Sequence, residues 1–142
     1  MKILISSLIT LCSFAVFAQT PSIGQKPEMP KGMKQYYIGF LVRGPNYQAN
    51  ISKDEREALF QKHIAYIRSQ AAAGKYRLSG PFLDDGNIGG MLIIDVPTEA
   101  EAREIVSRDP MVEAGRFALE LHRAMLADVS CVFAEYKKAG GQ

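Results

Sequence analysis

The sequence predicts an α+β fold, a ferredoxin-like split β-α-β-β-α-β chain with a four-stranded antiparallel sheet and two helices on one face. Three observations predict it. Two segments with helical spacing of apolar residues each begin at a capping residue. Four short segments rich in β-branched and aromatic residues flank these helices in the order strand, helix, strand, strand, helix, strand. The chain is also long enough for one domain of ordinary size.

The N-terminal segment, residues 1–18, is predicted to be a secretory signal peptide. A short positive start precedes an apolar run, and small or aliphatic residues suit cleavage after Ala18. The run is shorter than the roughly 20 apolar residues of a membrane anchor. We therefore expect an exported protein, periplasmic or extracellular, with no membrane anchor. Residues 19–34, which contain prolines and glycines, are predicted to be a disordered leader, and Cys131 is expected to be the only cysteine left.

The domain is expected to span residues 35–128. Its first strand is "QYYIGFLVRG", in which both alternating faces carry apolar side chains. After a loop, Ser52 opens the first helix, because Ser52 and Glu55 have the spacing of a capping box. Gly74 is predicted to end this helix at the position where a left-handed backbone is favoured.

A hairpin is predicted after this helix. Residues 75–82 form its first strand, with Tyr76 and Leu78 expected on one face. The stretch "LDDGNIGG" supplies turn residues, and Asp85-Gly86 is the expected tight pair. The apolar run "MLIIDV" is the second strand of the hairpin.

The second helix is predicted to begin after Thr98, which forms a second capping box with Glu101. Asp109-Pro110 is expected to end it. Its predicted buried stripe consists of Ala102, Ile105 and Val106.

The last strand is predicted to run from Phe117 to Met125, followed by a C-terminal extension, residues 129–142, in which Val129 to Phe133 is a candidate fifth strand. A sheet with both helices on one face leaves its other face open. We therefore expect a homodimer that packs the open faces together. The candidate contact residues, on one face or the other, are Ile38, Phe40, Leu119 and Leu121.

A histidine and an aspartate are the main candidates for chemistry. His63 has helical spacing to Phe60 and Ile67, so it belongs on or beside the core stripe, where a histidine is most often structural. Asp109 stands at the end of the second helix, where the helix dipole disfavours negative charge. One explanation is that aspartate before proline initiates a turn. The other is that Asp109 orients His63, because the two helices lie side by side in this fold.

Two stretches of the chain resemble the YCII-related family of small ferredoxin-like proteins. They are "HIAYIRSQAAAGKYRLSGPF" and "TEAEAREIVSRDPMVEAG", and the resemblance runs from about Tyr36 to Leu126. It implies dimers with a pocket that holds a His–Asp pair, here His63 and Asp109. The matching strand segment beside that pocket is Ser79, Gly80 and Pro81. Muconolactone isomerases share the fold more distantly, and some relatives are lyases on halogenated aromatic rings.

Other residues are weaker candidates. Arg43 can bind an anionic substrate, because a guanidinium group suits carboxylates, or it is a solvated strand end. Tyr37 and Tyr66 line a pocket or fill the core, and His122 faces a dimer partner or solvent. Two histidines without ligand spacing indicate no metal site, and we expect no cofactor. Dispersed, nearly balanced charge argues against nucleic acid as a partner.

Three functions fit these observations. The first is a cofactor-independent lyase or isomerase that uses the His–Asp pair for acid–base chemistry on a small cyclic or aromatic compound. The second is a protein that binds such a small molecule without turnover. The third is a structural dimeric domain in which the pair is only a buried ion pair. The first two require a cleft beside His63, and the third predicts none.

Overall fold

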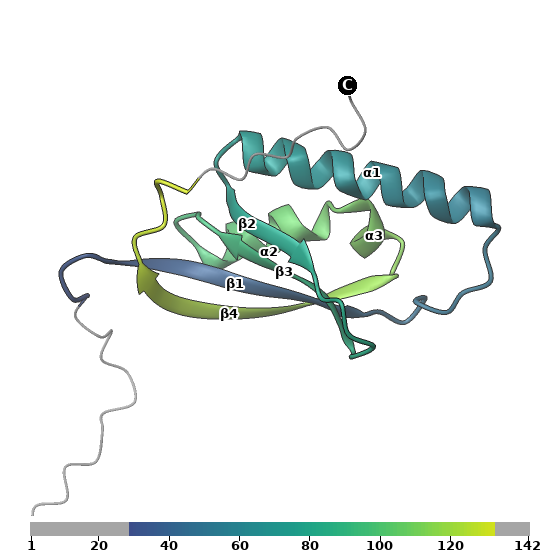
Figure 1. The fold of residues 1–142 in the computed structure, drawn as a ribbon, viewed down its shortest axis with the longest axis horizontal. Coiled ribbons are helices and arrows are strands. Elements are labelled where there is room, and N and C mark those ends of the chain that lie inside the picture. Colours follow the sequence, from purple (N-terminus) through teal and green to yellow (C-terminus); the bar gives the residue numbers. More distant parts are fainter. Residues whose placement is uncertain (1–28, 133–142) are drawn as a thin grey trace, which may run out of the picture.

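The computed structural model describes residues 29–132, which form one sheet and three helices (Figure 1). The predicted signal peptide, the leader up to residue 28 and the extension from residue 133 lie outside the described residues. Within the described part, no helix combines the length and apolar character needed to cross a membrane. The elements are β1 (Met33–Arg43), α1 (Lys53–Ala72), β2 (Tyr76–Pro81), β3 (Ile88–Ile94), α2 (Glu99–Ser107), α3 (Pro110–Glu113) and β4 (Phe117–Ala127).

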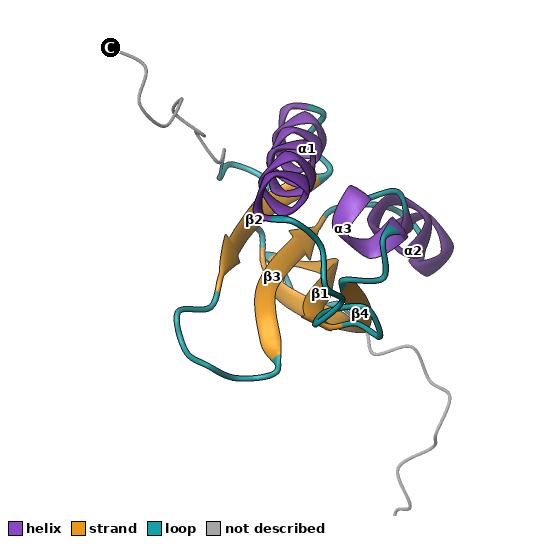
Figure 2. Cartoon of the chain, turned by 90° about the vertical axis from the view of Figure 1, so that its right-hand side faces the viewer, coloured by secondary structure: helices purple, strands orange, loops and turns teal. Residues whose placement is uncertain are grey.

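The predicted fold class is confirmed. The strands pair antiparallel in the order β2-β3-β1-β4, so the two central strands are β3 and β1. This is the order of a split β-α-β-β-α-β fold. All three helices lie on one face of the sheet, with α1 over the β2 side and α2 and α3 over the β1 and β4 side (Figure 2). Within residues 29–132, the other face carries no helix.

The ends of α1 are set by local sequence, as predicted. The Ser52 hydroxyl accepts from the Glu55 N–H at 3.2 Å, and the Glu55 carboxylate accepts from the Ser52 N–H at 2.8 Å. Both bonds satisfy N–H groups that a helix start leaves without partners. At the other end, Gly74 has φ +71°, a backbone conformation that suits glycine.

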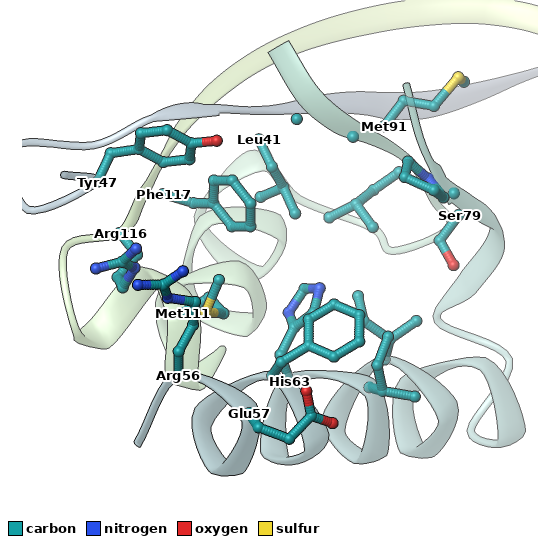
Figure 3. Close-up of a pocket in the computed structure, with 18 of the residues that line it drawn as sticks. Leu41, Tyr47, Arg56, Glu57, His63, Ser79, Met91, Met111, Arg116 and Phe117 are labelled. Atoms are coloured by element: carbon teal, nitrogen blue, oxygen red, sulfur yellow. The ribbon is translucent and has the colours of Figure 1, made fainter. Parts of the chain in front are cut away.

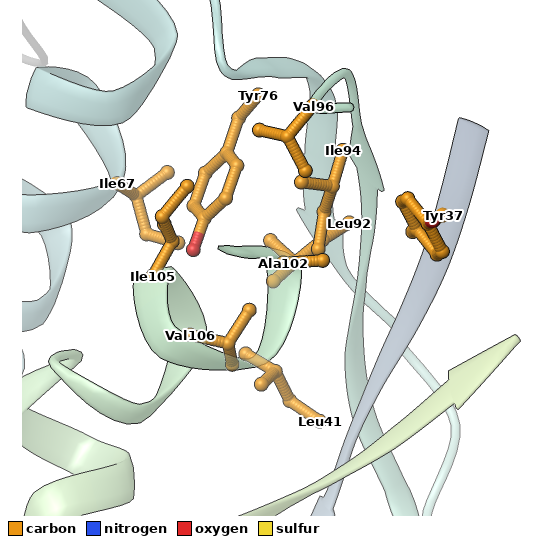
Figure 4. Close-up of a cluster of buried hydrophobic side chains, with 10 residues drawn as sticks. All are labelled: Tyr37, Leu41, Ile67, Tyr76, Leu92, Ile94, Val96, Ala102, Ile105 and Val106. Carbon is orange, nitrogen blue, oxygen red and sulfur yellow. The ribbon is translucent and has the colours of Figure 1, made fainter. Parts of the chain in front are cut away.

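The core lies between the sheet, α2 and the C-terminal half of α1 (Figure 4). It consists of Tyr37, Leu41, Ile67, Tyr76, Leu92, Ile94, Val96, Ala102, Ile105 and Val106. Leu119 and Leu121 pack against it, so these two dimer candidates lie on the helix side. Ile38 and Phe40 alternate with Tyr37 and Leu41 along β1 and therefore face the open side.

The prediction that Tyr76 and Leu78 share a face is wrong. Tyr76 pairs with Ile94 and Leu78 with Ile93, so an extra residue, Arg77, bulges out of β2. The bulge puts the two side chains on opposite faces. Tyr76 is 2% exposed in the core, whereas Leu78 is 43% exposed.

The predicted tight pair Asp85-Gly86 is also wrong. The loop between β2 and β3 comprises residues 82–87, and Phe82 and Gly89 are joined by a backbone hydrogen bond of 3.2 Å. A tight turn of the expected type needs positive φ at both central residues, and Gly86 is not among the glycines with positive φ. Instead, the Asp84 carboxylate accepts from the Gly86 N–H at 3.2 Å, which supports a wider loop.

The structure differs from the sequence predictions at three further places. Thr98 caps α2 by accepting from the Glu101 N–H, but the Glu101 carboxylate lies 3.4 Å from Lys75 and completes no capping box. The segment after Asp109 forms α3 rather than a plain link. Residues 129–132 form a turn, not part of a fifth strand.

Candidate functional site

A cavity of about 800 Å³ lies between α1 and the sheet (Figure 3). Its walls come from α1, the loop after β1, the adjoining ends of β2 and β3, and the segment from α3 to β4. The lining residues are Leu41, Tyr47, Gln48, Ala49, Lys53, Arg56, Glu57, Phe60, His63, Ile64, Ile67, Ser79, Gly80, Pro81, Gly89, Gly90, Met91, Leu92, Met111, Arg116 and Phe117.

Glycines on β3 leave room for this cavity. Gly90 pairs with Leu41, which faces the helices, so Gly90 faces the helices too. A Cβ there would lie 2.9 Å from the Gly80 carbonyl oxygen, and a Cβ at Gly89 would lie 2.7 Å from the Phe117 ring. Because these positions carry no side chains, β3 adds no side-chain atoms to the space under α1 at Gly89 and Gly90.

His63 projects from α1 into this cavity (Figure 3). The residue is 8% exposed, and its ring centroid lies 6.1 Å from those of Phe60 and Phe117. Two aromatic rings of the cavity lining therefore flank the imidazole. This burial agrees with the predicted position of His63 on or beside the apolar stripe of the helix.

Behind His63 lies the carboxylate of Asp109, which is 1% exposed. His63 Nδ1 is 2.8 Å from both Asp109 oxygens, within the distance expected for an oriented pair. Asp109 Oδ1 also accepts from the Met111 N–H at 2.9 Å, as the N-cap of α3. Two partners thus hold the carboxylate in one orientation.

The position of Asp109 differs from the one expected from the sequence, because a second short helix starts there. Asp109 does follow α2, but it also begins α3, where negative charge is favourable. The local explanation and the partnership with His63 therefore hold together. An ionised carboxylate can only accept, so the His63 Nδ1–H donates to it, and in the neutral form of the ring Nε2 carries the lone pair.

Three of the predicted binding residues line the cavity and two do not. Ser79, Gly80 and Pro81 lie along its β2 wall. Arg43 packs its guanidinium 4.9 Å from the centre of the Tyr47 ring and donates to the Asp85 carbonyl, outside the lining.

The hydroxyl of Tyr66 donates to the Ile105 carbonyl at 2.6 Å, and burial raises the pKa of Tyr66. This hydrogen bond joins α1 to α2, and Tyr66 is not among the residues that line the cavity. Tyr37 lies in the core. His122 is exposed beside Phe40, at 5.9 Å between ring centroids, on the open face.

Sequence reasoning missed the cationic residues of the lining, Lys53, Arg56 and Arg116. Arg56 stands seven residues before His63, two helical turns, and this spacing places both on one face of α1. That signal was available in the sequence. No spacing in the sequence indicated Arg116. Its position at the cavity depends on the preceding turn, in which Gly115 has φ +68°.

Among the described residues, no group of three or more His, Cys, Asp and Glu side chains is arranged to hold a metal ion.

Comparisons with known proteins give one family and several similar solved structures. A family model described as the YCII-related domain matches residues 39–121. No curated protein matches the chain. A similar solved structure is 5-chloro-2-hydroxyhydroquinone dehydrochlorinase from Burkholderia phenoliruptrix AC1100 in complex with 2,5-dihydroxybenzoquinone. The two are 25% identical, the match covers 64% of this chain and 93% of that chain, and the TM-score is 0.47.

Proposed function

This chain belongs to the YCII-related family, and from that premise we propose that it is a cofactor-independent acid–base enzyme, a lyase or isomerase acting on a small cyclic or aromatic compound. The observation that carries the proposal is the His63–Asp109 pair, 2.8 Å apart, with the imidazole facing the cavity and the carboxylate buried behind it. A base needs an oriented ring and an open nitrogen. This pair supplies both.

The cavity suits a small ligand. Its volume of about 800 Å³ lies within the range of ordinary small-molecule sites. Leu41, Phe60, Ile64 and Phe117 give it largely apolar walls. A planar ring fits against such walls, and polar groups at a few points would fix its orientation.

In the proposed reaction, His63 Nε2 removes a proton from a ligand carbon that an adjacent group makes acidic. The imidazolium that forms is stabilised by the Asp109 carboxylate on Nδ1. In an isomerase, the same proton returns to another atom of the ligand. In a lyase, a leaving group departs with its bonding electron pair, and the bound proton is released afterwards.

A purely structural role predicts no cleft beside His63, so the cavity favours a role in binding or catalysis. Binding without turnover uses the same cavity and differs only in chemistry. Exchange of carbon-bound protons separates the two, since it reports proton abstraction even where the natural reaction is unknown.

The test is hydrogen–deuterium exchange, followed by proton NMR in D₂O, on a panel of cyclic enones, lactones and hydroxyquinones. His63→Gln is expected to reduce the catalysed exchange by roughly 10²–10⁴-fold, the usual contribution of a positioned base. Asp109→Asn is expected to reduce it as well while circular dichroism shows the fold intact. His122→Gln, the other histidine, is the matched control and should exchange like the parent. Exchange that survives His63→Gln would refute the proposal.

We also propose that the protein is exported after cleavage behind Ala18, from the signal-like residues 1–18. Those residues lie outside the described part of the structure. N-terminal sequencing of exported material should begin at Gln19, and a retained Met1 would disprove cleavage.

A further inference from the structure

We infer that the compound bound beside His63 is a carboxylic acid, whose carboxylate is held by Arg56 and Arg116 at one end of the cavity. The inference rests on the proposed function, in that it takes this cavity as the substrate site. It narrows the substrate class to small apolar cyclic acids.

The first support is the uncompensated charge of the lining. Among the described residues that line the cavity, Lys53, Arg56 and Arg116 are cationic and Glu57 alone carries a carboxylate. Glu57 accepts from the Gln61 amide at 2.7 Å, and none of the ion pairs in the described part of the chain involves any of the three cations. Among the described residues, the three cations of the lining therefore have no ion-pair partner.

The second support is the way Arg116 is held. Its Nη1 donates to the carbonyls of Asn46 and Ala49, both at 3.2 Å, and its guanidinium carbon lies 5.9 Å from the centre of the Tyr47 ring. These contacts fix the guanidinium plane. Its Nε is nevertheless buried without a hydrogen-bond partner. A buried donor left without an acceptor is costly, but Nε has no exposed surface, so a ligand would approach the guanidinium from its terminal nitrogens.

The third support is the position of Arg56. It lies on the same face of α1 as His63, two turns earlier, and is exposed at the end of the cavity where Arg116 and Tyr47 lie (Figure 3). A guanidinium group presents paired donors that match a carboxylate, and two such groups can bind one from two sides. Between this end and His63 the walls are Phe117, Leu41 and Phe60, so the body of the acid would lie against apolar rings with a ring carbon near Nε2.

The sequence suggests Arg43 as the arginine that binds an anionic substrate, but Arg43 lies outside the cavity lining. Arg56 and Arg116 have the chemistry expected of Arg43 at the position where a ligand can reach them.

The experiment compares benzoate with benzamide, which has the same ring but no charge. Binding is followed by the shift of the His63 ring proton in proton NMR, which is simple to assign because the chain has two histidines. The parent protein is expected to bind benzoate about tenfold or more tightly than benzamide, as a charge-assisted contact implies. Added salt should weaken benzoate alone, since the subsite is partly exposed.

Arg56→Gln is the test variant and Lys62→Gln the matched control. Both remove one positive charge from α1, but only Arg56 lines the cavity. Arg56→Gln is expected to weaken benzoate roughly five- to tenfold and to leave benzamide unchanged. Lys62→Gln is expected to change neither. Equal binding of the two probes to the parent, or an equal loss in both variants, would overturn the inference.

These results are separable from those on catalysis. Benzoate binding that depends on Arg56, in a protein that exchanges no carbon-bound proton, upholds the carboxylate site and refutes the enzyme. Catalysed exchange confined to neutral compounds, with no preference for benzoate, refutes the carboxylate site and upholds the enzyme.

Discussion

The Asp109 side chain serves a structural and a chemical purpose with the same two oxygens. It caps α3 through the Met111 N–H and accepts from His63 Nδ1. Asparagine is as good an N-cap as aspartate, so Asp109→Asn keeps the cap while it removes the charge that stabilises a protonated His63. An alanine at this position would lose both roles, and its effect on activity could not be assigned to either.

Tyr66 on α1 and Tyr76 on β2 differ in the hydrogen bond of the hydroxyl group, and this gives a matched pair of stability predictions. The Tyr66 hydroxyl has the Ile105 carbonyl as a partner, whereas the Tyr76 hydroxyl is buried without one. Tyr66→Phe is expected to lower the free energy of unfolding by about 1 kcal/mol. Tyr76→Phe should leave it unchanged or raise it by up to about 1 kcal/mol, since it removes an unpaired buried group. Urea unfolding measures both, and an equal loss in the two variants would contradict the assignment.

Among the elements, β3 approaches β2 closely at Gly90, and Gly90 on β3 with Gly80 on β2 gives a matched pair that tests this packing. A Cβ at Gly90 would meet the Gly80 carbonyl oxygen at 2.9 Å, whereas a Cβ at Gly80 would meet nothing within 4 Å. Gly90→Ala is expected to cost about 1–3 kcal/mol by forcing β2 away. Gly80→Ala should be neutral or stabilising by up to about 1 kcal/mol, since alanine restricts the unfolded chain. Thermal unfolding of the pair checks this, and a tolerated Gly90→Ala would mean that the edge strand moves freely.

The Asp95 carboxylate, just after β3, joins the starts of β1 and β2. It lies 2.8 Å from Lys34 Nζ and 2.9 Å from Arg77 Nε. Burial by itself would raise the pKa of Asp95, but the hydrogen bonds from Lys34 and Arg77 outweigh it and lower the pKa below its usual value. The bulge in β2 that moves Leu78 to the open face is centred on Arg77.

This lowered pKa predicts acid sensitivity. The unfolded chain takes up the proton more readily, so the stabilisation is present above the unfolded pKa of about 4 and is lost as pH falls through the folded pKa. Asp95→Asn should be less stable than the parent near pH 7, and the difference should shrink on acidification. Asp85→Asn is the control, because that carboxylate has no hydrogen bond or ion pair in the described residues, and its curve should parallel the parent's. Parallel curves for Asp95→Asn as well would show that this pair of bonds contributes nothing.

The sequence could predict features that depend on neighbouring residues, but only in part those that depend on partners far along the chain. The caps at Ser52 and Gly74 depend on neighbours within a few residues, so spacing alone located the ends of α1. The bulge at Arg77 depends on partners far along the chain, and alternation could not reveal it. The contact of His63 with Asp109 was within reach because the fold places α1 beside the end of α2, but α3 was too short to leave a periodic pattern.

At the scale of the whole molecule, the face of the sheet opposite the helices is a surface that no described helix covers. The turn after β4 covers one end of it: the Tyr36 hydroxyl donates to Asp128 and accepts from the Val129 N–H, and Tyr36 is fully buried. Elsewhere the face is largely apolar, although Glu120 and His122 on β4 also lie on it. Phe40 lies 6.5 Å from Phe82 between ring centroids, and Phe82 is 38% exposed.

We expect two copies of the chain to pack these faces together, because an exposed apolar patch on a sheet favours association and a second copy offers a matching surface. Phe40→Glu would place a charge at the centre of the patch, beside Glu120 on the neighbouring strand, and should convert a dimer into a monomer. Ala58→Glu adds the same charge to an exposed position on α1, in the opposite layer, and should leave the mass unchanged. Light scattering coupled to size-exclusion chromatography at micromolar concentration measures both. A parent protein that already runs as a monomer would refute this interface, and a Phe40→Glu variant that remains dimeric would place the contact elsewhere.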